Sequence, residues 1–326
     1  MTGMALAQVD PTRIVAVVNG DEINGAEYYR KMEYLPGVGR RIANGFAEFP
    51  PGFMTLEQLI TEHLLFGLAR EKGVYPTDPE VQAELRARSE ESPRLLDDWL
   101  ASGQTRGELE LLIRYELAQF KLLTFGITIT DQEVETHYKE HPAEFTIPKR
   151  LTLRSIVVTT EEGKQAVDAA LAAGKDFASV ARERSEDISR AVGGEFGTLP
   201  IGVLPEAVRN ALADVKIGKT TGWIAAESLK PQPVGGAPTV PVGGPWVRFL
   251  LEAVLPEELQ PLTPQLKRNT RKRLMLDRGK GKNDLNKDMA EMRAKAKVDI
   301  KQKEFAEAYA RYMDAYLKGK GLKSGG

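Results

Sequence analysis

The chain has 326 residues, of which 42% are hydrophobic and 28% are charged, and its formal net charge is −1. This length is sufficient for two or three domains with cores of their own, and the ordinary hydrophobic content excludes wholesale disorder. The absence of cysteine excludes disulfides, thiolate metal sites and cysteine nucleophiles. No apolar run is long enough for a membrane span, which needs about 18 residues.

Residues 1–13 carry a faint targeting signal. Ala5-Leu6-Ala7 has the small-x-small pattern of a signal-peptide cleavage site. The basic and apolar stretches that come before such a site are missing from the sequence. We therefore expect residues 1–13 to be either disordered or the remnant of an export signal that is incomplete in this chain.

A strand, a turn and a helix are predicted next. Ile14–Val18 is a β-prone run, and Asn19-Gly20 predicts a tight turn directly after it. Asn24 predicts the N-cap of a helix that ends near Glu33. The Gly- and Pro-rich residues 36–54 predict an irregular loop.

The pattern from residue 55 to residue 145 is helical. Thr55 and Gln58 resemble a capping box, apolar residues then recur at helical spacing, and Gly73 predicts the end of this first helix. A second helix opens at Thr77, with Pro79 inside its first turn. Three further helices are predicted over residues 94–101, 105–125 and 130–145.

The period changes after Pro148. Apolar side chains alternate over residues 151–158, as they do in a strand, and a second strand is predicted over residues 246–254. Between them, Gly193-Gly194 and Gly197 mark a passage rich in turns, and residues 230–245 predict a loop insertion. The helices of this region are expected over residues 162–173, 177–184 and 205–213. Its proline-rich borders, at 148 and 256–264, predict domain boundaries.

The C-terminal segment is basic and helical through Arg293. The last 70 residues hold roughly 18 lysines and arginines against 10 acidic residues. The stretch Lys267–Lys287 is basic enough to contact nucleic acid or an anionic membrane, but it lacks interleaved aromatics and any binding motif. We interpret it as a solvated helical face and predict no nucleic-acid partner.

Two features close the chain. Lys297–Ile300 is β-prone and can pair with Ile14–Val18, which would join the first and last segments in one domain. An amphipathic helix follows, whose apolar stripe is either a packing face or a surface for other polypeptides, with packing in the core or between subunits favoured. The stripe consists of Phe305, Tyr309, Tyr312, Met313 and Tyr316.

All three histidines lie in the first half of the chain. His137 and His141 are four residues apart on a predicted helix, a spacing that metal sites use. Because Pro142 ends the helix and no third ligand is evident, we favour a solvated helix end and predict no metal site. His63 lies on the apolar face of its helix and is interpreted as a structural residue.

Several segments together resemble the SurA/PrsA class of bacterial extracytoplasmic foldases, which join a helical chaperone domain to a parvulin domain. Val15–Ile23 resembles the start of the chaperone domain, and Leu59–Val74 resembles its central helix. Ile127–Tyr138 is similar to the helix that leads into the isomerase domain, and Lys295–Ile300 to the closing strand.

The parvulin resemblance covers about 100 residues. It rests on Gly174–Ala181, Arg184–Asp187, Gly193–Gly197 and Pro205-Glu206, in the order and spacing of that domain. A parvulin site has two histidines and an acidic residue or cysteine beside an apolar slot for proline. The segment from Arg150 to Val254 contains no histidine.

Carrying the parvulin site over by resemblance predicts a degenerate site. Asp187 matches the acidic member, whereas Ser155 and Val247 stand at the two histidine positions. The slot positions match Phe196, Leu199, Val203 and Ala207, so that valine and alanine replace methionine and phenylalanine. We therefore expect weak or no isomerase activity, and Asp187 is interpreted as a cap or turn residue more readily than as a catalytic one.

The predicted fold is α+β. Residues 14–147 and 257–317 are expected to form a largely helical chaperone domain closed by a small sheet. Residues 148–256 are expected to form an inserted parvulin-like domain, in which helices flank a small antiparallel sheet. Residues 318–326 are expected to be a disordered tail.

The resemblance implies an extracytoplasmic foldase or chaperone, in the periplasm or cell envelope, that binds unfolded or proline-containing polypeptides without a cofactor. Two alternatives stay open: an active peptidyl-prolyl cis-trans isomerase, and a scaffold that binds one fixed partner through the aromatic C-terminal helix. A homodimer is also left open.

Overall fold

The computed structural model describes residues 10–33, 39–42, 45–50, 52–225 and 246–320. The chain forms an α+β structure of two compact units, which consist of residues 1–130 with 268–326 and of residues 131–267. The borders of the second unit, at 130/131 and 267/268, differ from the junctions at 147/148 and 256/257 that the sequence predicted from its prolines. The second unit is therefore longer at both ends than predicted. The residues between the two sets of borders contact one another, since Lys267 Nζ lies 2.6 Å from Glu135 Oε1 and Tyr138 Oη donates to the Gln260 carbonyl.

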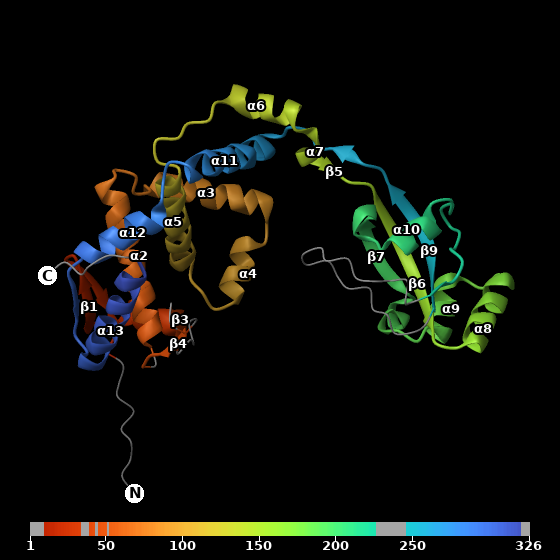
Figure 1. Ribbon diagram of the computed structural model, residues 1–326, viewed down its shortest axis with the longest axis horizontal. Coiled ribbons are helices and arrows are strands. Elements are labelled where there is room, and N and C mark those ends of the chain that lie inside the picture. The colour runs from red at the N-terminus through yellow and green to blue at the C-terminus, as the bar shows by residue number, and fades with distance from the viewer. Residues whose placement is uncertain (1–9, 34–38, 43–44, 51, 226–245, 321–326) are drawn as a thin grey trace, which may run out of the picture. The chain divides into compact units, whose positions relative to one another are not determined.

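The first unit, called the helical unit below, is closed by a three-stranded antiparallel sheet. Its strand order is β11 (Val298–Ile300), β1 (Ile14–Val18) and β2 (Asp21–Asn24). The turn between β1 and β2 is made by Asn19 and Gly20, both with positive φ, at 52° and 97°. The pairing of the first and last segments, expected from the sequence, is confirmed by the register Val17–Asp299 (Figure 1).

The helices of this unit begin at capping residues that the sequence displays. Thr77 and Thr105 each form a capping box, with Glu80 and Glu108 respectively, and Asn24 accepts a hydrogen bond from the Glu27 amide. The helices are α1 (Gly25–Met32), α2 (Phe53–Glu71), α3 (Asp78–Glu91), α4 (Leu95–Ala101), α5 (Arg106–Leu123), α11 (Pro264–Lys280), α12 (Leu285–Lys295) and α13 (Lys303–Lys320).

Three sequence predictions for this unit are wrong. Helix α2 begins at Phe53, after a left-handed Gly52, so that Thr55 is fully buried inside the helix instead of capping it. Residues 36–54, predicted as an irregular loop, contain the antiparallel pair β3 (Gly39–Ile42) and β4 (Gly45–Glu48). Helix α13 continues through Lys320, past the predicted start of the tail.

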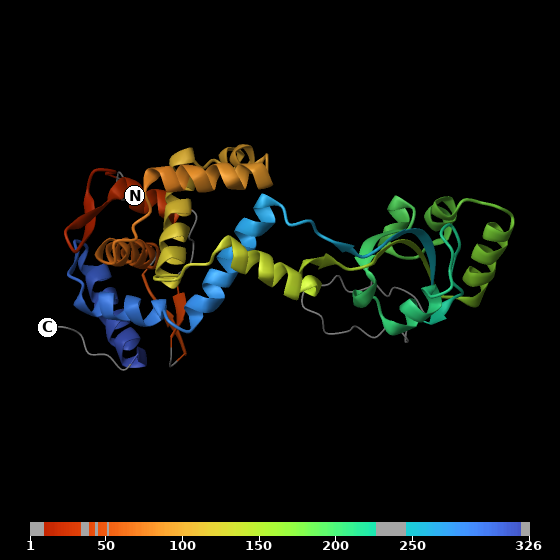
Figure 2. The same ribbon diagram turned by 90° about the horizontal axis from the view of Figure 1, so that it is seen from above.

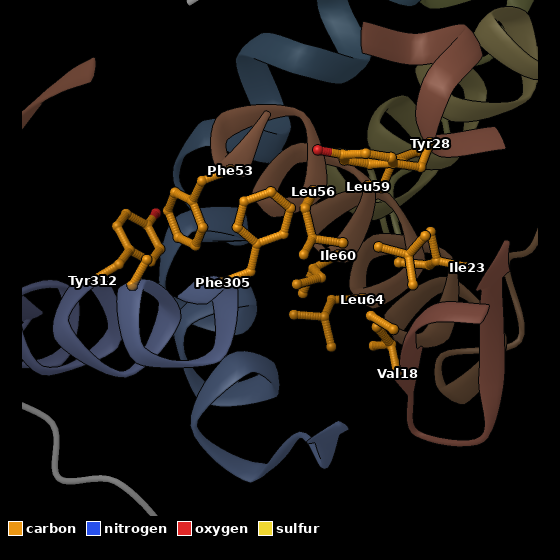
Figure 3. Packing of buried hydrophobic residues seen from close by; sticks show 13 residues of the cluster. Val18, Ile23, Tyr28, Phe53, Leu56, Leu59, Ile60, Leu64, Phe305 and Tyr312 are labelled. Carbon is orange, nitrogen blue, oxygen red and sulfur yellow. The ribbon is translucent and has the colours of Figure 1, made fainter. Parts of the chain in front are cut away.

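The core of the helical unit lies between α2, α13 and the sheet. Phe53 and Phe305 lie with ring centroids 6.4 Å apart, and Tyr312 packs against Phe53 at 6.2 Å. Figure 3 shows these rings pointing toward one another from α2 and α13, to the left of Leu56 and Ile60. The aromatic stripe of α13 is therefore a packing face within the chain, since Phe305 and Tyr312 are buried and the other three members pack partly buried against the same cluster.

The second unit, called the parvulin-like unit below, starts with α6 (Asp131–Glu140) and α7 (Pro142–Phe145). The sequence predicted a single helix here, but the helix breaks at His141, because Pro142 offers no amide proton and instead begins the next helix. A short ladder of β5 (Thr146–Ile147) with β10 (Glu258–Leu259) joins the two ends of the unit.

The sheet of the parvulin-like unit has four antiparallel strands. Their order is β7 (Glu195–Pro200), β6 (Arg150–Val158), β9 (Trp246–Leu255) and β8 (Ile224–Ala225). The helical segments that flank it (Figures 1 and 2) are α8 (Glu161–Ala172), α9 (Phe177–Arg184), η1 (Ile188–Val192), η2 (Ile201–Val203) and α10 (Glu206–Leu212). The predicted turn-rich passage thus contains an edge strand, β7, and the predicted loop 230–245 lies outside the described residues.

Each face of this sheet has a core of its own. Leu153 and Val157 of β6 pack with Val208 and Leu212 of α10. Ile156 and Val158 pack on the opposite face with helices α8 and α9. Successive side chains of β6 therefore point to opposite faces of the sheet, as the sequence predicted for a strand, and each face packs against its own helices. Within the described ranges, no helix is long and apolar enough to cross a membrane.

Candidate functional site

The two positions that match the parvulin histidines lie in the apolar core of the parvulin-like unit. Ser155 in β6 is 2% exposed and Val247 in β9 is 3% exposed. Ser155 pairs with Phe249 across the ladder, and Val247 pairs with Val157. Both positions therefore lie on the two central strands of the sheet, which pair with each other, and other residues of the chain shield both side chains from solvent.

Phe249 is buried on the face of the sheet that carries Val247. Its side chain is fully buried, and its ring meets that of Phe196 edge-on, with centroids 5.3 Å apart and an interplanar angle of 77°. Its backbone amide donates to the hydroxyl of the buried Thr221 at 3.0 Å. Sequence reasoning considered the register around Val247 and missed Phe249, although the alternation of Val247, Phe249 and Leu251 was a visible signal for one buried face.

The predicted slot residues divide into two groups. Phe196, Leu199 and Ala207 are partly buried and pack against the same apolar cluster as Phe249. Val203, in η2, is half-buried and is not among the residues of that cluster. The positions come from β7, η2 and α10, which are consecutive along the chain, so their proximity follows from local folding.

Asp187 acts as a cap in the structure. Its Oδ1 accepts a hydrogen bond of 2.7 Å from the Ser185 hydroxyl, and its Oδ2 lies 3.4 Å from the amide of Ser189, at the start of η1. The Ser185 hydroxyl also accepts a bond from the Val157 amide of β6. These two hydrogen bonds, from Val157 to Ser185 and from Ser185 to Asp187, connect the segment after α9 to the central strand β6. The sequence interpretation did not single out Ser185.

Gly194 allows the backbone to pass directly against β6. Its φ is +75°, and a Cβ built on it would lie 2.3 Å from the carbonyl oxygen of Ser155. The Ser155 amide donates to the Gly194 carbonyl at 2.7 Å. The sequence analysis interpreted Gly193-Gly194 as a turn. Glycine is also needed at position 194 because the two backbones approach too closely there for a side chain.

A cavity of about 370 Å³ lies in the helical unit. It lies between helices α1, α2, α4 and α5, and Leu111 and Leu112 of α5 remain 43% and 39% exposed there. Its apolar lining is formed by Leu59, Trp99, Leu111, Leu112 and Tyr115, and its polar lining by Glu27, Arg30, Lys31, Gln58, Glu62, Gln104 and Glu108. The lining of this cavity was not identified from the sequence, because it comes from four separate helices.

Ion pairs fix the polar side chains of the cavity. Arg30 Nε donates to Glu108 Oε1 at 2.7 Å, and Lys31 Nζ donates to Glu62 Oε1 at 2.7 Å. The hydrogen bond from Arg30, together with those from the Thr105 amide and hydroxyl, lowers the pKa of Glu108 to about 2. Both cations of the lining are thus paired with carboxylates, and the third carboxylate, Glu27, lies beside His63, so the apolar side chains of the cavity adjoin polar groups that already have partners.

The remaining candidates have structural partners. His63 is near Glu27, with Nε2 3.4 Å from Oε1. The basic residues of α11 pair with carboxylates, for example Lys272 with Glu84 at 2.8 Å. These contacts agree with the sequence interpretation of both features as structural or solvated.

The comparisons with known proteins agree with this architecture. Residues 129–263 match the family of the PPIC-type PPIase domain. The foldase protein PrsA of Caldanaerobacter subterraneus subsp. tengcongensis is 28% identical over 220 residues, which cover 63% of this chain and 67% of that protein. These matches support a foldase of the SurA/PrsA type with a PPIC-type domain.

Two further known proteins are similar to this chain to different extents. The periplasmic chaperone PpiD of Haemophilus ducreyi is 33% identical over 108 residues, which cover 32% of this foldase and only 17% of PpiD. A solved structure of a SurA-like chaperone of Campylobacter jejuni covers 89% of this foldase and 100% of its own chain, with 19% identity and a TM-score of 0.36.

Proposed function

We propose that this foldase acts mainly as a chaperone for unfolded polypeptides and that its parvulin-like unit has weak or no isomerase activity. The observation that carries the proposal is the burial of the site positions. Ser155 and Val247 are buried in the protein's own core, and the buried Phe249, which pairs with Ser155, packs against the ring of Phe196.

The chemistry of prolyl isomerisation explains why this burial matters. The barrier to rotation of a peptide bond is roughly 18–20 kcal/mol, and a catalyst must bind the twisted amide more tightly than either planar form. That requires polar groups within hydrogen-bond reach of the bond and an open slot for the ring. A serine at 2% exposure and a valine at 3% offer neither.

The cavity of the helical unit supports the chaperone role. Its apolar floor, with Trp99, Leu111 and Leu112, suits one or two apolar side chains of an extended, unfolded segment. Because its charged residues are already paired, such a segment would bind through burial of apolar surface, with little selection for its sequence. The binding requires no cofactor or nucleotide.

The proposed location of this activity is outside the cytoplasm. The proposal rests on kinship with the PrsA foldases and with a chaperone that is named as periplasmic. Clients there would be exported polypeptides that have not yet folded.

The first experiment is an isomerase assay without a coupling protease, on proline tetrapeptides with micromolar protein. We expect relaxation at the uncatalysed rate, which takes tens of seconds or longer. The second candidate function, an active isomerase, is favoured by the match of the whole unit to the PPIase family. A clear acceleration that Asp187→Ala abolishes would establish that alternative and refute the degenerate-site proposal.

The second experiment tests the cavity through suppression of aggregation of an unrelated unfolded protein. Leu112→Glu places a charge on the apolar lining and should weaken suppression severalfold. Ile188→Glu is the matched control, since Ile188 is 85% exposed and belongs to the parvulin-like unit, not to the cavity lining. Equal suppression by both variants would contradict a role for the cavity.

The same assay separates the scaffold alternative from the chaperone. A scaffold would show one saturable partner and no suppression for unrelated clients. The aromatic residues of α13, from which that alternative was inferred, are packed into the core of the helical unit. A fixed partner would therefore have to use a different surface.

A further inference from the structure

Three side chains with metal-ligating atoms meet at the break between α6 and α7. They are His137 of α6, His141 in the break and Glu144 of α7, and one ligand atom from each lies within 4.8 Å of the others. The sequence interpretation dismissed the two histidines because a third ligand was missing. Folding supplies it, because the new helix that starts at Pro142 brings Glu144 back beside His137.

The backbone orients the ring of His141. Its Nδ1 lies 3.0 Å from the carbonyl oxygen of His137, and a carbonyl oxygen can only accept. The neutral ring therefore carries its proton on Nδ1 and its lone pair on Nε2. An Nδ1–H bond to a backbone carbonyl is the arrangement that fixes the tautomer of many metal-bound histidines.

The other two ligand atoms are already close together. His137 Nε2 lies 3.0 Å from Glu144 Oε2, and ligand atoms around a tetrahedral Zn²⁺ are about 3.3 Å apart, from bond lengths of about 2.0–2.1 Å. The two imidazole rings stack with centroids 4.2 Å apart and 24° between their planes. The buried Phe145 meets His137 edge-on at 5.9 Å, which anchors α7 beside α6.

We propose that His137, His141 and Glu144 form a binding site for a divalent transition-metal ion, with Zn²⁺ as the fitting ion and water as the fourth ligand. Two imidazoles and one carboxylate are a donor set that Zn²⁺ favours, and an open fourth position is common in such three-residue sites. The metal would replace the direct contact between His137 and Glu144. It would also tie α6 to α7 across the break, a role that goes beyond the proposed chaperone function.

The test begins with a zinc titration of the full, untagged chain, followed by long-range ¹H–¹⁵N NMR of the imidazole nitrogens. The chain has no cysteine and only three histidines, so each ring is resolved and background binding is low. We expect saturation at one ion per chain, with large shifts of His137 and His141 nitrogens. The ring of His63, which contacts Glu27 in the helical unit, should stay unchanged.

The variants His141→Ala and Glu144→Gln should each weaken zinc binding at least tenfold, since even the loss of an outer-shell partner costs roughly 10–100-fold. His63→Ala and Glu140→Gln are matched controls and should keep the original affinity. Failure to saturate below millimolar zinc, an equal response of all three rings, or unchanged affinity in both ligand variants would overturn the proposal.

A second measurement keeps the proposal testable if a variant folds poorly. Co²⁺ added to the unmodified chain should give the intense visible absorption of four-coordinate cobalt. Only the weak absorption of six-coordinate, largely aqueous cobalt would contradict the site. Circular dichroism of each variant identifies those whose helices are disturbed.

Discussion

The helical unit contains a buried ion pair whose disruption should be costly. Arg293 of α12 and Glu57 of α2 are 4% and 5% exposed at their side chains, and Arg293 Nη1 lies 3.0 Å from Glu57 Oε1. Arg293 also donates to the Thr61 hydroxyl, and its guanidinium lies 5.1 Å from the ring centroid of Tyr316. Burial is the largest single influence and lowers the pKa of Arg293, but Glu57 together with the three neighbouring tyrosines outweighs it, so the pKa of Arg293 is raised.

The size of the effect follows from these distances. Two unit charges 3.0 Å apart attract by about 5 kcal/mol at an effective dielectric constant of 20, and desolvation of both groups offsets much of that gain. Removing one partner leaves the other buried without its counter-charge. Glu57→Gln and Arg293→Met should therefore each lower the free energy of unfolding by about 3–5 kcal/mol.

The double variant should lose much less than the sum of the two single losses. An apolar methionine beside a neutral glutamine removes the uncompensated charge, and coupling between contacting residues is typically about 0.5–3 kcal/mol. This double-mutant cycle thus separates the attraction between Arg293 and Glu57 from the free-energy cost of burying their charges. The exposed pair Arg94–Asp98, with side chains 81% and 60% exposed, is the control, and Asp98→Asn should change stability by less than about 0.5 kcal/mol.

Native-state hydrogen exchange with mass spectrometry is the suitable assay, because it reads α2 and α12 separately from the parvulin-like unit. Peptides from β6 serve as an internal reference that should stay unchanged in all variants. Single-variant losses below about 1 kcal/mol in α2 would refute the reasoning, since they would mean that water reaches the pair in solution.

Three further predictions concern single groups. Gly194→Ala places a Cβ 2.3 Å from the Ser155 carbonyl at φ +75° and should destabilise the parvulin-like unit by about 2 kcal/mol or more in urea unfolding. Gly218→Ala, with φ +78° but open space, should cost only about 1 kcal/mol. The charged form of Glu108 stabilises the fold above its ordinary pKa of 4.5, and this gain is lost as pH falls toward its folded pKa of about 2. Glu108→Gln should therefore remove about 1–2 kcal/mol at pH 7, a value reduced for solvent screening, and flatten the acid limb of the stability curve. Asp187→Ala should lower the melting temperature through loss of a cap of about 1 kcal/mol while leaving proline relaxation unchanged.

Local chemistry made much of the fold predictable. The capping boxes at Thr77 and Thr105 determine where α3 and α5 begin, because their reciprocal hydrogen bonds involve residues only three apart. Asn19-Gly20 likewise determines the turn between β1 and β2. Even the distant pairing of β1 with β11 was accessible, since each is a short β-prone run with no other predicted partner.

The elements that were missed depend on contacts from far along the chain. Strand β7, Glu195–Pro200, contains glutamate, glycine and proline, residue types that are depleted in strands, and it forms because it pairs with β6. The start of α2 was misplaced because Gly52 takes a left-handed conformation and Thr55 is buried by the fold. Neither the pairing nor the burial can be read from the local sequence.

The candidate site illustrates the same limit in chemical terms. The sequence shows that the segment from Arg150 to Val254 contains no histidine, whatever the register of its strands. It does not show what occupies the place of the parvulin groups, since that depends on which residue of β9 faces Ser155. In the structure the buried Phe249 pairs with Ser155, and burying a phenylalanine contributes about 1.5–3 kcal/mol. A polar network in the same position would need hydrogen-bond partners and water, both of which the apolar core excludes. Stability of the parvulin-like unit and prolyl catalysis therefore compete for the same face of the sheet, and restoring a histidine at position 155 without first removing the Phe249 ring should lower stability without producing activity.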